Sequence, residues 1–160
     1  MSVTAAPAKP SKNKRRELIL ERFAPYRIVA LGHEVSGRLA RAYRDENITI
    51  PEWRVLAVVA QADEVAARDV VKRTPMDKMT VSRAVASLEE KGFVRRMTSA
   101  SDRRVSMLSL AVSGRALFDR IAALALAYED DLLSALSAEE REAFEQALSK
   151  LEARAQENGD

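Results

Sequence analysis

The segment from Asp77 to Leu110 constrains the fold more than any other part of the chain. Its sequence is DKMTVSRAVASLEEKGFVRRMTSASDRRVSMLSL. The apolar residues that recur there at helical spacing are Val81, Val85 and Leu88. They predict a short amphipathic helix over 77–92, and the stretches 93–98 and 104–110 predict a β-hairpin. A helix followed by a basic hairpin favours a winged helix-turn-helix, whose helix enters the major groove of DNA.

Capping residues and a proline delimit this helix. Asp77 is suited to the N-cap, and Gly92 is suited to the left-handed position that follows a last helical turn. A shorter helix is expected over 66–73. Pro75 then marks a turn, because the residue before a proline disfavours the helical conformation.

The remaining apolar patterns predict a mainly helical chain. Further helices are expected over residues 25–44, 49–62, 113–136 and 137–155, with a separate helical turn over 17–22. Thr49 with Glu52, and Ser137 with Glu140, have the spacing of capping boxes. The predicted fold class is therefore mainly α with a small β-hairpin wing.

Composition excludes several kinds of chemistry. The chain has no cysteine and one histidine, so disulfides, a thiolate nucleophile and a Cys/His zinc site are excluded. No glycine-rich phosphate loop or metal-ligand spacing is present, and we expect no enzyme activity, metal or cofactor. No apolar run is long enough to span a membrane, and the first residues lack a signal peptide's apolar centre. A cytoplasmic protein is expected.

Charge is distributed unevenly along the chain. The net charge of +2 combines five Lys/Arg and no acid in residues 1–16, a net −1 in residues 17–63, a net +4 in residues 64–110 and a net −6 in residues 111–160. A basic middle and an acidic C-terminal third suggest one face for a polyanion and another for a protein partner. The alternative is an ordinary soluble surface with uneven charge.

The predicted helix over 77–92 has small and basic residues outside its apolar stripe. These candidate DNA contacts are Lys78, Thr80, Ser82, Arg83 and Ser87. Small side chains let a helix backbone approach base edges, and an arginine can bind guanine through two hydrogen bonds. The same pattern also fits an amphipathic surface helix that binds nothing.

The hairpin loop carries Asp102, Arg103 and Arg104. Adjacent arginines beside a DNA-reading helix can enter the minor groove, where the negative potential is strong. Asp102 can orient Arg104 by a charge-assisted hydrogen bond, or the two can form a surface ion pair of little consequence. Arg95 and Arg96 offer phosphate contacts or are solvated charges on a strand.

These segments resemble the MarR-type family of bacterial transcription regulators. KMTVSRAVASLEEKGFVRR and SDRRVSMLSL are similar to its recognition helix and wing, and the resemblance spans about residues 18–155. It implies that Thr80, Ser82 and Arg83 contact the major groove. It also implies that Asp102 holds Arg104, and that Arg103 or Arg104 contacts the minor groove.

The resemblance implies a homodimer that binds double-stranded DNA at a pseudo-palindromic operator, usually as a repressor. Residues 49–111 would form the DNA-binding lobe, and residues 17–48 and 112–157 a helical dimerisation region, after a disordered basic arm over 1–16. One departure concerns the start of the helix after the wing. Ala111 stands where the family has a capping threonine, so we expect Ser113 to cap a helix that begins later.

Regulators of this kind often respond to a small molecule, commonly an aromatic acid or phenol. The candidate ligand-binding residues are His33, Trp53 and Tyr26. The alternatives are a solvated or interface histidine and a core tryptophan. A different function, non-specific architectural DNA binding, is favoured slightly by the basic arm. Loss of most DNA affinity on deletion of residues 1–16 would support it.

Overall fold

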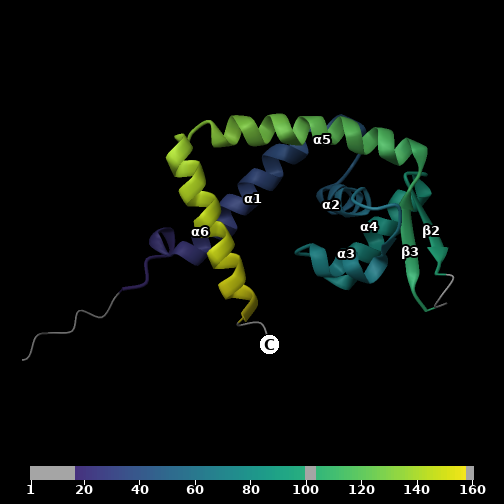
Figure 1. Ribbon diagram of the computed structural model, residues 1–160, viewed down its shortest axis with the longest axis horizontal. Helices are drawn as coiled ribbons and strands as arrows, with labels where there is room; N and C mark the ends of the chain where they lie inside the picture. Colours follow the sequence, from purple (N-terminus) through teal and green to yellow (C-terminus); the bar gives the residue numbers. More distant parts are fainter. Residues whose placement is uncertain (1–16, 100–103, 158–160) are drawn as a thin grey trace, which may run out of the picture. The chain divides into compact units, whose positions relative to one another are not determined.

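A computed structural model describes residues 17–99 and 104–157 of the chain (Figure 1). The chain divides into two compact units, one ending at Val35 and the other beginning at Ser36. The long helix α1 (Ala24–Ala42) runs from the first unit into the second. It occupies the span expected for a helix over 25–44.

The first unit contains the 3-10 helix η1 (Leu20–Arg22) and the N-terminal part of α1. The helical turn expected over 17–22 is therefore confirmed in part. Neither element contains a buried residue. The exposed large apolar residues here are Leu18, Ile19, Leu20, Phe23, Tyr26, Ile28, Val29 and Leu31.

The second unit contains the other elements. Its helices are η2 (Arg44–Glu46), α2 (Ile50–Val59), α3 (Ala67–Arg73), α4 (Lys78–Glu90), α5 (Val112–Leu133) and α6 (Ala138–Glu157). Its strands are β1 (Val65–Ala66), β2 (Val94–Thr98) and β3 (Ser106–Leu110). The mainly helical fold class with a hairpin wing is confirmed.

The strands form one antiparallel sheet in the order β1-β3-β2. β2 and β3 pair along their full length, from Val94 opposite Leu110 to Thr98 opposite Ser106. β1 adds a third strand that the sequence did not predict, because two residues are too short to show alternation. Ala66, which we expected to begin a helix, pairs with Met107 instead.

The core lies where α2, α3, α4, the sheet and the start of α5 meet. Its fully buried side chains include Leu56, Val70, Val85, Leu88, Leu108, Leu117 and Ile121. Val81 is also buried, so the apolar stripe predicted for the helix after Asp77 faces the core. This packing fixes the orientation of α4 within the second unit.

Side-chain hydrogen bonds confirm the predicted helix caps at Thr49, Asp77 and Ser137. Ser137 and Glu140 form a capping box, with the Glu140 amide donating to the Ser137 hydroxyl at 3.2 Å. Gly92 has the predicted left-handed conformation, with φ of 74°. The expectation for Ser113 is wrong. α5 already begins at Val112, and the Ser113 hydroxyl donates to the Gly92 carbonyl at 2.7 Å.

The described residues contain neither a candidate membrane span nor a candidate metal site. None of the helices within residues 17–99 and 104–157 is long and apolar enough to cross a membrane. In the same part of the chain, no group of histidine and acidic side chains could hold a metal ion.

Candidate nucleic-acid interface

The outer face of α4 is exposed along its length. Met79, Ser82, Arg83 and Ala86 follow one another at i, i+3, i+4 and i+7, so they lie on one side of the helix. Opposite them are the apolar residues that anchor α4 in the core. We define these four residues as the outer face of α4. It presents one guanidinium between small and apolar groups.

A basic groove runs beside this face, between α3 and α4. It has a volume of about 460 Å³ and an apolar floor. The floor comprises Val71, Val81 and Val85, and the basic residues around it are Arg68, Lys72, Lys78 and Arg96. Ser82 lines it from α4. Four positive side chains at one groove give it an affinity for a polyanion.

Arg96 is also part of an ion pair. Its guanidinium lies 2.8 Å from the carboxylate of Glu89, and its Nε donates to the same oxygen at 3.0 Å. The pair links β2 to α4 and leaves both side chains partly exposed. Part of the charge of Arg96 is therefore neutralised within the protein.

Thr80 and Ser87 lie on the other flank of α4, toward α2. The Thr80 hydroxyl and amide donate to the two carboxylate oxygens of Asp77, at 3.0 and 2.8 Å. Both hydrogen bonds lower the pKa of Asp77, and the bond from the amide has the larger effect. They also complete the predicted cap. Ser87 donates to Glu52 at 2.6 Å. Both hydroxyls thus have partners within the protein.

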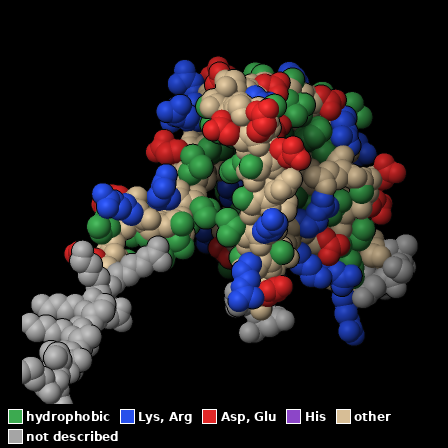
Figure 2. Space-filling view, turned by 60° about the vertical axis from the view of Figure 1, so that its left-hand side comes forward, with side chains coloured by type: hydrophobic (Ala, Val, Ile, Leu, Met, Phe, Trp, Pro, Cys, Tyr) green, Lys and Arg blue, Asp and Glu red, His purple; other side chains and the backbone are tan. Residues whose placement is uncertain are grey.

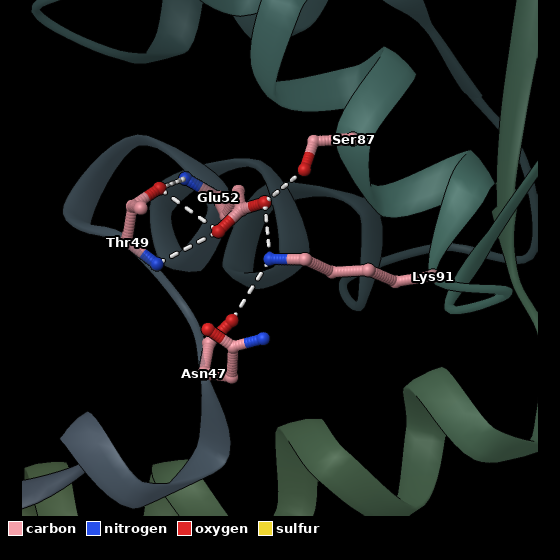
Figure 3. Close-up of polar contacts among 5 residues, drawn as sticks. All are labelled: Asn47, Thr49, Glu52, Ser87 and Lys91. Carbon is pink, nitrogen blue, oxygen red and sulfur yellow. Dashed lines mark hydrogen bonds and ion pairs between the residues drawn. The ribbon is translucent and has the colours of Figure 1, made fainter.

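Glu52 is the buried centre of this flank (Figure 3). One carboxylate oxygen accepts from the amide and hydroxyl of Thr49, at 2.8 and 2.9 Å. The other accepts from Ser87 and from the Lys91 ammonium, which is 2.8 Å away. Lys91 also donates to the carbonyl of Asn47 at 2.8 Å. We call these five residues the Glu52 cluster.

The Glu52 cluster connects the start of α2 to the C-terminal end of α4. Burial alone raises the pKa of Glu52, but the hydrogen bonds from Lys91, Ser87 and Thr49 together outweigh it and lower the pKa. The carboxylate is therefore ionised at neutral pH. Sequence reasoning found the capping box of Thr49 and Glu52 and missed Lys91. The sequence did contain one indication of this contact, because Ser87 and Lys91 are one helical turn apart and can therefore reach the same partner.

Comparison with known proteins identifies this arrangement. The model of the MarR family matches residues 46–105, which contain α4, the basic groove and β2. A MarR-family transcriptional regulator from Silicibacter pomeroyi has 28% sequence identity and a TM-score of 0.74. That alignment covers 87% of this chain and 96% of that one. These matches support the predicted resemblance to MarR-type winged-helix regulators.

Two further relatives agree. The transcriptional regulator HosA of Escherichia coli O157:H7 is 26% identical over 105 residues, which are 66% of this chain and 78% of HosA. The structure of a Staphylococcus aureus MepR–DNA complex has 25% identity and a TM-score of 0.76, covering 82% of this chain and 98% of MepR. MarR-family proteins are DNA-binding transcription regulators rather than enzymes.

The wing, which consists of β2, β3 and the loop between them, is described in part. Arg104 is exposed at the end of the loop that leads to β3, and Arg95 is exposed on β2. Asp102 and Arg103 lie outside the described residues. The predicted orientation of Arg104 by Asp102 therefore stays a prediction.

The predicted ligand-binding residues are divided between the two units, and their joint role stays a prediction. His33 and Tyr26 are exposed on α1 in the first unit. Trp53 lies in the second unit, half-buried, with its ring stacked on that of Phe118 at 5.8 Å and tilted toward that of Tyr43 at 6.0 Å. The indole ring therefore has two aromatic neighbours, an environment typical of a packed core.

Proposed function

We propose that this protein is a homodimeric repressor that binds a pseudo-palindromic operator and is released by a small molecule. The observation that carries the DNA-binding part is the exposed outer face of α4 beside a basic groove. In this proposal residues 49–111 form the DNA-binding lobe. Residues 17–48 and 112–157 form the dimerisation region, and residues 1–16 a basic arm.

α4 would enter the major groove of the operator. Arg83 stands at the middle of the outer face and can donate two hydrogen bonds to one guanine. Ala86 is small and exposed, so the helix backbone can approach the bases there. Lys78, Arg68 and Lys72 around the groove would contact phosphates. Thr80 and Ser87 are left out of the base contacts because their hydroxyls are bonded to Asp77 and Glu52.

The wing would bind beside this helix. Arg104, with Arg103 and Asp102, would reach the minor groove, as predicted for the family resemblance. The phosphate and minor-groove contacts carry little sequence information by themselves. Affinity should therefore fall steeply with salt, while sequence preference depends on α4.

Arg83→Ala tests the role of α4. We expect it to weaken binding to the preferred operator by about 1–3 kcal/mol and to relax the base preference at one position per half-site. Arg44→Ala is the matched control, because this arginine is also exposed and lies in η2, away from α4. Fluorescence anisotropy on the upstream DNA and on scrambled DNA measures both effects. Equal loss in the two variants would show that only net charge matters.

The architectural alternative makes a different prediction for the same measurement. Such a protein would bind the upstream and scrambled duplexes equally, and would lose most affinity when residues 1–16 are deleted. The proposed repressor should retain its sequence preference without them. A promoter–reporter assay, with and without the protein, separates repression from activation.

Exposed apolar side chains support a dimer. In the C-terminal helices they are Val112, Leu124, Leu126, Leu132, Phe144, Leu148 and Leu151. α6 has no buried residue, and hydrophobic side chains are visible among charged groups on the face that carries it (Figure 2). A single chain would leave this surface in water, and large exposed apolar patches mark protein interfaces.

A double variant tests the dimer. Leu148→Asp with Leu151→Asp places two carboxylates on the apolar side of α6, and burying them in an interface would be unfavourable. We expect light scattering to give twice the chain mass of 17.7 kDa for the wild type and the single mass for the variant. Matched changes at exposed polar sites, Gln146→Asp and Lys150→Asp, should leave the dimer intact. A monomeric wild type would contradict the proposal.

The response to a small molecule is supported by the resemblance to the MarR family alone. We propose an aromatic acid or phenol as the effector, with His33 and Tyr26 on α1 as the candidate contacts. Trp53 is less suited because its ring is already packed against those of Tyr43 and Phe118. Thermal unfolding with a panel of such acids tests the proposal, since a ligand that binds the folded state raises the midpoint. If no acid in the panel raises the midpoint of unfolding, the proposed effector class is wrong.

A further inference from the structure

Met79 is an exposed apolar side chain in a lobe that buries most others. Among the described residues of 49–111, the large apolar side chains that are exposed are Met79, at 61%, and Met97, at 48%. Exposing an apolar side chain to water is unfavourable. An isolated exposed apolar residue is ordinary on a protein surface, so its position decides whether it has a role.

Met79 lies in the first turn of α4, on the outer face with Ser82, Arg83 and Ala86. The N-terminal residues of a recognition helix are the ones that contact base edges. Long side chains in a helix point back toward its N-terminus. The methionine thioether therefore extends from the end of α4 that would lie deepest in the groove.

We propose that Met79 recognises the C5 methyl group of a thymine in each half-site. This inference rests on the proposed function and specifies one base of the operator DNA that the protein would recognise. The thymine methyl is the apolar group that the major groove displays, and apolar side chains contact it. Contact would remove both the methyl and the thioether from water, which is favourable for two apolar groups.

The geometry of α4 also limits where that thymine lies. Met79 and Arg83 are four residues apart, about one helical turn of 5.4 Å. Successive base pairs are separated by about 3.4 Å. The thymine recognised by Met79 is therefore within roughly two base pairs of the guanine recognised by Arg83.

Replacing thymine by uracil tests the inference, because it removes the methyl and leaves base pairing unchanged. The full-length protein is first used to select duplexes from a random-sequence library. Each thymine of the selected site is then replaced singly by uracil. We expect one position per half-site at which the replacement weakens wild-type binding by about fourfold, the effect of one buried methyl. At that position Met79→Ala should bind the thymine and uracil duplexes equally.

Met97→Ala is the control, since Met97 is the other exposed methionine of the lobe and lies on β2. It should keep the wild-type sensitivity to uracil. Met79→Ala with a uracil profile like the wild type would overturn the inference while leaving sequence-specific binding intact. Failure of any sequence to enrich would instead overturn the proposed function, and this inference with it.

Discussion

Replacing Gly114 by alanine is expected to lower the free energy of unfolding by about 2–3 kcal/mol. Gly114 is buried in the first turn of α5, where a Cβ atom would overlap the carbonyl oxygen of Phe93. That oxygen also accepts the amide of Ala111 at 2.9 Å. The added methyl must therefore push α5 away from the segment between α4 and β2. The loss should appear in urea denaturation followed by circular dichroism.

The expected loss of stability is opposite in sign to the helix propensities of the two residues, which favour alanine over glycine. In a helix, alanine is more favourable than glycine by about 1 kcal/mol, so a site without steric conflict gains stability. Gly37→Ala is the matched control, because it is also helical and nothing lies within 4 Å of the position of its Cβ. We expect a gain there of up to about 1 kcal/mol. A gain in stability for Gly114→Ala would show that the first turn of α5 does not lie against the carbonyl of Phe93.

The elements that the sequence predicted correctly are those specified by local pattern. The helix after Asp77 was found because its cap, its apolar spacing and Gly92 all lie within one short segment. The structure confirms the cap, with the Thr80 amide 2.8 Å from Asp77. The hairpin was found for the same reason, since each strand carries its own signal.

The features that the sequence did not predict depend on residues far apart in the chain. The hydrogen bond from Ser87 to Glu52, 35 residues earlier, was not predicted, because Ser87 was considered only as a candidate DNA contact. No pattern within α4 distinguishes a hydroxyl that faces α2 from one that faces solvent. Ser113 was expected to cap α5, but the Gly92 carbonyl accepts its hydroxyl across the junction with α4. A pattern within a few residues of sequence does not show which distant group such a hydroxyl contacts.

The exposed position of Met79 could not be predicted from the sequence either. In the sequence it is one apolar residue in a helix with several, and its spacing assigns it to no stripe. Its exposure becomes informative only once the structure shows which other apolar side chains of the lobe are buried. The outer face of α4 therefore shares Ser82 and Arg83 with the predicted contacts and adds Met79 and Ala86. Of the other predicted contacts on this helix, Lys78 lies at the basic groove, and Thr80 and Ser87 lie on the other flank.

Glu52→Gln should destabilise the lobe by about 2–3 kcal/mol at neutral pH, although it changes the side chain's size very little. The carboxylate accepts four hydrogen bonds, two from Thr49 and one each from Ser87 and Lys91. A glutamine amide offers one acceptor oxygen and turns an NH₂ group toward donors. Either the cap of α2 or the contacts of Lys91 must then be lost. Urea denaturation of both proteins measures the difference.

The pH dependence of that difference identifies its cause. The pKa of Glu52 in the folded protein is lowered from 4.5, so the folded state favours the ionised form. Its contribution is present above 4.5 and is lost as the pH falls through the folded pKa. The gap between wild type and Glu52→Gln should therefore be full at neutral pH and close on acidification. Glu89→Gln is the control: its ion pair with Arg96 is partly exposed, and we expect a loss of at most about 1 kcal/mol. Equal losses in the two variants would mean that burial of Glu52 contributes nothing to the attachment of α4.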